Sequence, residues 1–167
     1  DGSKTTNNLW GERWSKLITN SMRNPVIAAS GLTNVSSDLE PVTRRLSIRI
    51  AAEGVRVATA NGIELEAIRG IPADTWIACA NGDDNAFGTI EARVIQAAEN
   101  AKTDGRPSMA QDVEKGRRSE IDFMNGLIVR TGKMLGLETP ANEGIVTAMR
   151  SVDARTAAPS VDVVRDI

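Results

Sequence analysis

The chain has 167 residues, of which 41% are hydrophobic and 25% are charged, a composition typical of one folded domain rather than a disordered segment. Its 20 Lys and Arg residues nearly balance 22 Asp and Glu residues, so the net charge of −2 disfavours nucleic-acid binding, and no apolar run has the length of a membrane span. The sequence has no His, no Tyr and one Cys, which excludes His-dependent catalysis, disulfides within the chain and Cys-based zinc sites. Acid–base chemistry is left to Lys, Asp and Glu.

The start of the chain is linker-like over residues 1–8, which predicts that another segment precedes it. No glycine-rich turn of the kind that binds nucleotide phosphates occurs, so no cofactor-binding residue can be assigned, and no metal site is predicted. The single Cys79 and the absence of a targeting segment predict a cytoplasmic protein that does not bind membranes.

A first helix is predicted to begin near Leu9. Its apolar residues recur at the spacing of one helical face, and they are Trp10, Trp14, Leu17 and Ile18. Both tryptophans are therefore expected in the core. The helix is expected to end or kink at Asn24, because a residue before proline avoids the helical conformation, and a short helical segment over 26–29 should stop at Gly31.

A polar stripe runs along the same predicted helix. Lys16, Asn20 and Asn24 are four residues apart, so they project from one face. One cation and two amides together fit a small oxyanion such as a carboxylate. The alternative is an ordinary solvated face, which is the commoner origin of such a pattern.

Four further helices are predicted over 41–61, 73–80, 89–102 and 108–115. Glu53 lies on the apolar face of the first of them, where a buried hydrogen bond between helices is the favoured interpretation. Ser108 begins the last, and Gln111 three residues later gives the spacing of a capping box. A helix start also favours an anion, so Ser108 is interpreted as a cap that can still face a ligand.

The last third of the chain predicts a helix over 119–135 and another that begins at Pro140. Glu120 falls in the apolar stripe of the first, so a buried carboxylate with a Lys partner is expected there. A structural ion pair and a catalytic role are equally compatible with this pattern. Residues 154–167 are expected to form a fraying tail. Helical periodicity nearly throughout predicts an all-α fold.

Five short motifs occur in order between residues 9 and 149. They are Leu9-Trp10 with Trp14-Ser15-Lys16-Leu17, Asn20 and Asn24-Pro25; Glu53 with Val57-Ala58 and Gly62; Pro107-Ser108-Met109-Ala110-Gln111-Asp112; Arg118-Ser119-Glu120-Ile121-Asp122 with Asn125-Gly126; and Thr139-Pro140-Ala141-Asn142. Each motif alone is weak, but together the set resembles the C-terminal domain of the ketopantoate reductase (2-dehydropantoate 2-reductase) family.

The resemblance implies an all-α, multi-helix domain over 9–153, similar to the C-terminal domain of 6-phosphogluconate dehydrogenase. The linker at 1–8 would join it to an N-terminal Rossmann domain that binds most of the NADPH. The activity implied is the NADPH-dependent reduction of ketopantoate to pantoate in pantothenate biosynthesis, by an enzyme that is a homodimer by family analogy.

The resemblance also assigns roles to five residues. Lys16 and Glu120 correspond to the catalytic Lys and Glu of the family, and Asn20, Asn24 and Ser108 correspond to residues that bind the small 2-oxo acid substrate. We then expect Lys16 and Glu120 on facing helices within ion-pair reach, directly or through water. We also expect Ser108 to point to the same cleft as the two asparagines.

Two alternatives stay open from the sequence. The region 63–106 looks longer than in short family members and contains Trp76, so the same fold could serve a reductase of another 2-oxo acid. A non-catalytic helical dimerisation module is the alternative from another class. It predicts that replacing Lys16 or Glu120 alters stability alone.

Overall fold

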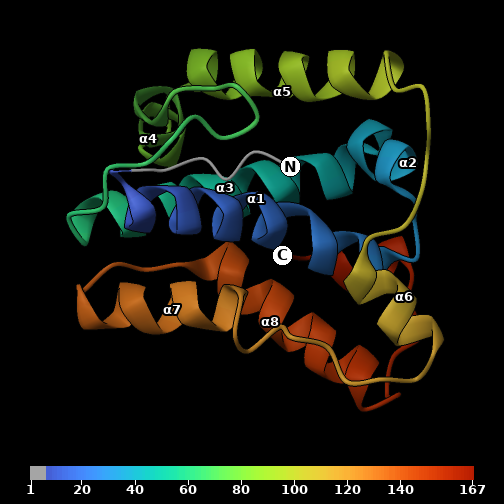
Figure 1. The fold of residues 1–167 in the computed structure, drawn as a ribbon. Coiled ribbons are helices and arrows are strands. Elements are labelled where there is room, and N and C mark those ends of the chain that lie inside the picture. The colour runs from blue at the N-terminus through green and yellow to red at the C-terminus, as the bar shows by residue number, and fades with distance from the viewer. Residues whose placement is uncertain (1–6) are drawn as a thin grey trace.

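The computed structural model describes residues 7–167, which form eight α-helices and one short 3-10 helix (Figure 1). The elements are α1 (Leu9–Ser30), α2 (Asn34–Leu39), α3 (Pro41–Ala60), α4 (Ala73–Ala80), α5 (Asp84–Glu99), α6 (Ser108–Glu114), α7 (Asn125–Met134), α8 (Pro140–Asp153) and η1 (Val161–Val164). In this described part, the sole β-type pairing is one bridge between Ile68 and Ile71. The predicted all-α fold is confirmed.

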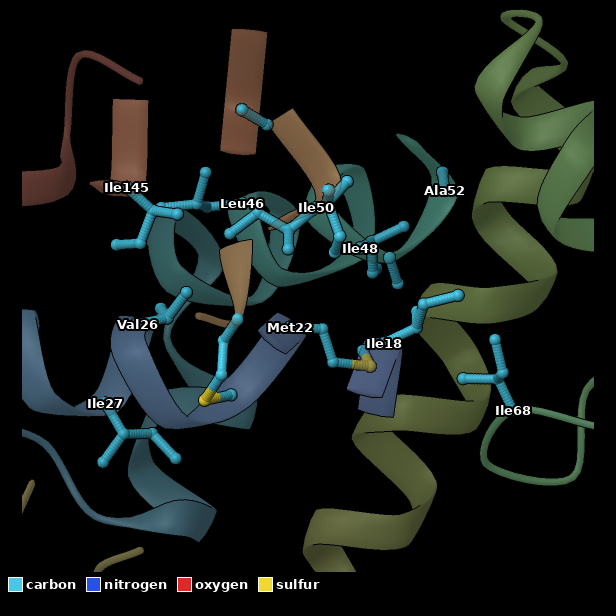
Figure 2. Close-up of a cluster of buried hydrophobic side chains, with 14 of the residues drawn as sticks. Ile18, Met22, Val26, Ile27, Leu46, Ile48, Ile50, Ala52, Ile68 and Ile145 are labelled. Carbon is cyan, nitrogen blue, oxygen red and sulfur yellow. The ribbon is translucent and has the colours of Figure 1, made fainter. Parts of the chain in front are cut away.

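Helices α1 and α3 pack against each other at the centre of the bundle. Figure 1 shows α4 and α5 on one side of this pair and α7 and α8 on the other, with α6 beside the C-terminal half of α1. Figure 2 shows the apolar side chains that α1, α3 and α8 bury between them, among them Ile18, Met22, Val26, Leu46, Ile50 and Ile145. Burying each such side chain contributes about 1.5–3 kcal/mol, so this interface fixes where the outer face of α1 points.

Helix α1 continues without interruption through Pro25, so the predicted end at Asn24 is wrong. Proline has no N–H to donate to the carbonyl four residues earlier, here that of Ser21. The side-chain Nδ2 of Asn125 donates to that carbonyl instead, at 3.1 Å. The helix ends as predicted at Gly31, whose φ of +74° closes it with an N–H bond to the Ile27 carbonyl.

Tryptophan burial at the start of α1 follows the prediction only in part. Trp14 is buried, whereas Trp10 is 62% exposed, with the Arg13 guanidinium 5.7 Å from its ring centre. Trp10 lies in the first turn of α1, where no other element of the described chain covers it. Trp76 on α4, unexplained by the sequence pattern, is wholly buried.

Helices α3 and α4 lie where the sequence predicts them, within one residue. Helix α2 was not predicted, and it begins with a capping box between Thr33 and Ser36. Helix α5 begins five residues earlier than expected, because the Asp83 side chain accepts from the N–H groups of Asn85 and Ala86.

The C-terminal part of the chain differs from the prediction at the start of α7 and over residues 154–167. Helix α7 begins at Asn125 rather than at 119, because residues 120–124 form turns. Residues 154–167 do not fray: the Ser160 N–H donates to the Ala29 carbonyl at 2.9 Å, and Val164 in η1 is buried.

The expected linker over 1–8 lies mostly outside the described residues, and Asn8 is the N-cap of α1. Within 7–167, no helix is both long enough and apolar enough to cross a membrane.

Candidate active site

The polar stripe of α1 faces out of the bundle. Lys16 is exposed, while Asn20 and Asn24 are half-buried. At a rise of 1.5 Å per residue, successive members of the stripe are about 6 Å apart along the helix axis. Lys16 forms no ion pair with any described residue, from 7 to 167. Its ammonium group is therefore available to a ligand or to another domain.

The stripe is flanked by two segments that are tied to α1. On one flank, the Ser15 hydroxyl accepts from the Glu66 N–H at 2.9 Å, which holds the segment 63–71 along the helix. On the other flank, Asn125 donates to the Ser21 carbonyl. Because residues of a helix are about 100° apart, Ser15 and Ser21 lie on opposite sides of Lys16. The outer face of α1 is thus an open strip between two fixed borders.

Glu120 is not where the sequence predicts it. It precedes α7, in a turn, and it is exposed rather than part of a buried helical stripe. Its neighbour Ile121 takes the buried position instead. The expected ion pair between Glu120 and Lys16 is absent among the described residues.

The turn that carries Glu120 is nevertheless held at both ends. The Ser119 hydroxyl donates to Asp153 Oδ2 at 2.7 Å, at the end of α8, and Asn125 reaches Ser21 on α1. The turn that carries Glu120 is therefore attached, through Asn125, to Ser21, the residue that follows Asn20 on α1.

Ser108 does not cap α6, so the predicted capping box is wrong. Pro107 occupies the N-cap position, Ser108 is the first helical residue with an exposed side chain, and Gln111 Nε2 donates to the Arg106 carbonyl. Helix α6 packs against α1, and the Arg106 guanidinium donates to the Gly31 carbonyl at the end of that helix. Ser108 is thereby placed beside the C-terminal half of α1, with its hydroxyl uncommitted to the helix.

A charged cluster that the sequence did not indicate adjoins the stripe. Arg23 is seven residues after Lys16, on the same side of α1, and it donates to the buried Asp38 carboxylate at 3.0 Å. Arg69, in a left-handed conformation with φ of 53°, binds the same carboxylate at 3.2 Å. Burial lowers the pKa of the Arg23 guanidinium, and Asp38 partly offsets this. Asp38 lies on α2, the helix missed from sequence.

Glu53 makes the buried hydrogen bonds between helices that its position predicts. Its carboxylate accepts from the backbone N–H groups of Ala141 and Asn142 at 2.9 and 3.0 Å and from Asn142 Nδ2 at 2.8 Å. Those N–H groups are at the start of α8, whose own N-cap side chain, Thr139, makes no capping bond. Burial raises the pKa of the Glu53 carboxyl, and the three hydrogen bonds partly offset the rise.

Two cavities in the described part of the chain lie away from the stripe. One of 560 Å³ is lined by residues of α3, α4 and α5 and by residues 136–140, and one of 600 Å³ is lined by residues 133–143. In the described part of the chain, no three Cys, Asp or Glu side chains gather closely enough to hold a metal ion. The outer face of α1 presents one cation and two amides, which are groups that can bind a small anion.

Comparison with known proteins shows the family to which this chain belongs. The sequence model described as "Ketopantoate reductase PanE/ApbA C terminal" matches residues 8–153. The chain belongs to the ketopantoate reductase C-terminal domain family. It is 31% identical over 140 residues to the 2-dehydropantoate 2-reductase of Pyrococcus horikoshii, an alignment that covers 84% of this chain and 39% of that protein.

Solved structures share the fold of this ketopantoate reductase domain. The PanE/ApbA family ketopantoate reductase from Ralstonia eutropha JMP134 is 28% identical, with a TM-score of 0.67, over 91% of this chain and 44% of that one. A D-mandelate dehydrogenase solved with NADH and anilino(oxo)acetate is 21% identical, with a TM-score of 0.68, over 90% of this chain and 43% of that one, and it shows the fold alone. The chain spans about 40% of the length of the first curated relatives it matches.

Asn125 and Asn142 belong to the motifs of this ketopantoate reductase domain, but the sequence pattern predicts no role for either. In the structure they are wholly buried and bonded to each other, with Asn125 Nδ2 donating to Asn142 Oδ1 at 3.0 Å. The signal that could have found Asn125 is Pro25, because a proline inside a helix leaves a carbonyl that needs another donor.

Proposed function

We propose that this chain is the substrate-binding and catalytic helical domain of an NADPH-dependent 2-dehydropantoate 2-reductase. The observation that carries the proposal is the outer strip of α1, where Lys16, Asn20 and Asn24 face outward between two fixed borders. The alignments to two relatives named 2-dehydropantoate 2-reductase cover 39% and 44% of those proteins, which leaves room for a preceding Rossmann domain to cover that strip.

The chemistry of the strip suits reduction of a ketone. Hydride addition to the 2-oxo carbon leaves negative charge on its oxygen, and an ammonium group beside that oxygen stabilises the charge and donates the proton. We assign this role to Lys16, because its ammonium group forms no ion pair with any residue that the structure describes and can donate a proton. NADPH supplies the hydride when bound. No glycine-rich phosphate-binding turn occurs in these 167 residues, so we assign its binding mainly to the preceding domain.

The remaining residues of the site bind and orient the substrate. The amides of Asn20 and Asn24 and the exposed hydroxyl of Ser108 offer hydrogen bonds to the carboxylate and hydroxyl groups of a 2-oxo acid. In the complete enzyme we assign Glu120 to accept a substrate hydroxyl and to hold Lys16 in place. Hydrogen bonds at catalytic sites are often long or unformed before the substrate binds, which fits the open geometry of Glu120.

A reductase of a different 2-oxo acid is the second candidate. The segment 63–71, within the region that looks elongated from sequence, forms one border of the strip and brings Arg69 beside Arg23. A border that contacts the ligand is where substrate choice changes most readily. The helical fold does not decide the substrate, because a fold hosts many functions.

The test is NADPH oxidation by the full-length protein, with its upstream coding segment restored, against ketopantoate and a panel of other 2-oxo acids. The proposal expects ketopantoate to give the highest kcat/KM, with NADPH preferred over NADH, and residues 1–167 alone to be inactive. Preference for another acid would retain the reaction and reassign the substrate. A folded protein that binds NADPH but reduces no 2-oxo acid would contradict the proposal.

A further inference from the structure

We infer that Asn125 is a positioning residue that sets the relative places of the residues on both sides of the proposed site. The inference rests on the proposed function and adds a residue that touches neither substrate nor cofactor. Its buried side-chain amide donates to the Ser21 carbonyl in the middle of α1 and to Asn142 Oδ1 on α8, and its backbone directly follows the turn that carries Glu120.

The first connection repairs α1 at the point where the helix lacks a backbone bond. Pro25 cannot donate to the Ser21 carbonyl, so the turn between them, which carries Asn24, is not closed by the helix itself. Prolines inside helices are the usual sites of kinks. Asn125 Nδ2 binds that carbonyl at 3.1 Å and thereby fixes Asn24 relative to Lys16, two turns earlier.

The second connection fixes the Glu120 turn on α1. Asn125 is the first residue of α7, and the turn before it folds back through bonds from Met124 N–H to the Glu120 carbonyl and from Gly126 N–H to the Ile121 carbonyl. Any shift of Asn125 along α1 therefore shifts Glu120 as well. Asn142 Oδ1 accepts the other amide hydrogen, and Glu53 in turn holds Asn142.

The tie is not the arrangement that stability alone would favour. Asn125 is 0% exposed, and its Oδ1, like the buried hydroxyl of Ser21, has no hydrogen-bond partner within the described residues. Leaving buried polar atoms unpaired costs stability, whereas an alanine at position 25 would satisfy the Ser21 carbonyl directly. A proline with a distant amide donor couples two segments that a regular helix would leave independent.

The experiment compares two variants of the full-length enzyme, Asn125→Ala and the double variant Pro25→Ala/Asn125→Ala. The double variant gives position 25 an N–H for the Ser21 carbonyl, so it recovers stability without recovering the tie to the Glu120 turn. We expect both variants to lower kcat/KM for ketopantoate by about 10-fold or more, with the KM for NADPH unchanged, since misplaced binding groups cost rate even without contact to the substrate. Ile90→Ala, in the buried face of α5, is the control: it lowers stability and leaves the KM for ketopantoate unchanged.

A wild-type kcat/KM in the folded Asn125→Ala enzyme would overturn the inference. A wild-type kcat/KM in the double variant would also overturn it, because Asn125 would then serve only as a hydrogen-bond donor to the Ser21 carbonyl. An inactive wild-type enzyme would instead refute the proposed function. The tie is then measured by amide hydrogen exchange, where faster exchange of residues 120–124 in the double variant supports it and unchanged exchange refutes it.

Discussion

Replacing Asn142 with alanine should destabilise this domain more than any exposed Asn→Ala change, because Asn142 is wholly buried and its side chain makes three hydrogen bonds. Nδ2 donates to Glu53 at 2.8 Å and to the Ile50 carbonyl at 3.1 Å, and Oδ1 accepts from Asn125 at 3.0 Å. A neutral bond contributes about 1 kcal/mol and a bond to a charged group about 2 kcal/mol. The expected loss in free energy of unfolding is therefore about 4 kcal/mol.

Urea unfolding of the 167-residue chain, followed by circular dichroism, measures this loss, and the melting temperature should fall by roughly 10 °C. Asn100→Ala is the matched control, because Asn100 is exposed at the end of α5 and its side chain donates only to the Gln96 carbonyl. The control should lose about 0.5 kcal/mol or less. Equal losses for the two variants would refute the view that the buried network holds α3, α7 and α8 together.

Two further predictions concern a carboxylate and two glycines. Burial raises the pKa of the Glu53 carboxyl, so its protonated form stabilises the fold below the ordinary pKa of about 4.3, and that contribution is lost as the pH rises through the raised pKa. The free energy of unfolding of the wild type should therefore increase relative to that of Glu53→Gln as the pH falls from 7 towards 4. Parallel pH profiles of the two proteins would contradict this prediction. Gly11→Ala should lower the free energy of unfolding by about 2 kcal/mol or more, because a Cβ at position 11 would overlap the Glu64 carbonyl. Gly88→Ala has open space in α5 and should raise the free energy of unfolding by about 0.5–1 kcal/mol. Similar effects at both glycines in thermal unfolding would show that the segment after α3 is not held against α1.

Local pattern was enough to predict most helices, the start of α1 near Leu9 and the helix stop at Gly31. Gly31 stops α1 and Pro140 starts α8 because positive φ and a missing N–H are properties of those residues themselves. Glu53 was interpreted correctly for a similar reason: a carboxylate on an apolar helix face must find donors, and the free N–H groups at a helix start are the nearest ones.

The errors came from partners that are distant in sequence. The sequence around Pro25 predicts a helix end, because it does not show that Asn125, 100 residues later, donates to the Ser21 carbonyl. The apolar spacing of Ile121 and Met124 predicts a helix that includes Glu120. In the structure, turns bury both apolar side chains, and no helix forms at Glu120.

The candidate site was predicted unevenly. The stripe on α1 depends only on helical spacing, so its members share a face as expected. The relation of Ser108 and Glu120 to that stripe depends on how α6 and the turn before α7 pack, which spacing cannot give. The Arg23–Asp38 ion pair was missed because α2 has too few residues to show a periodic pattern.

Lys16→Ala in the full-length enzyme tests the central claim most directly, with Lys102→Ala as the control at another exposed lysine. The account predicts that kcat for 2-oxo acid reduction falls by about 10²–10⁴-fold in Lys16→Ala, whereas the free energy of unfolding changes by less than about 0.5 kcal/mol in either variant. Undiminished turnover in Lys16→Ala would contradict the claim that the outer strip of α1 is the catalytic face.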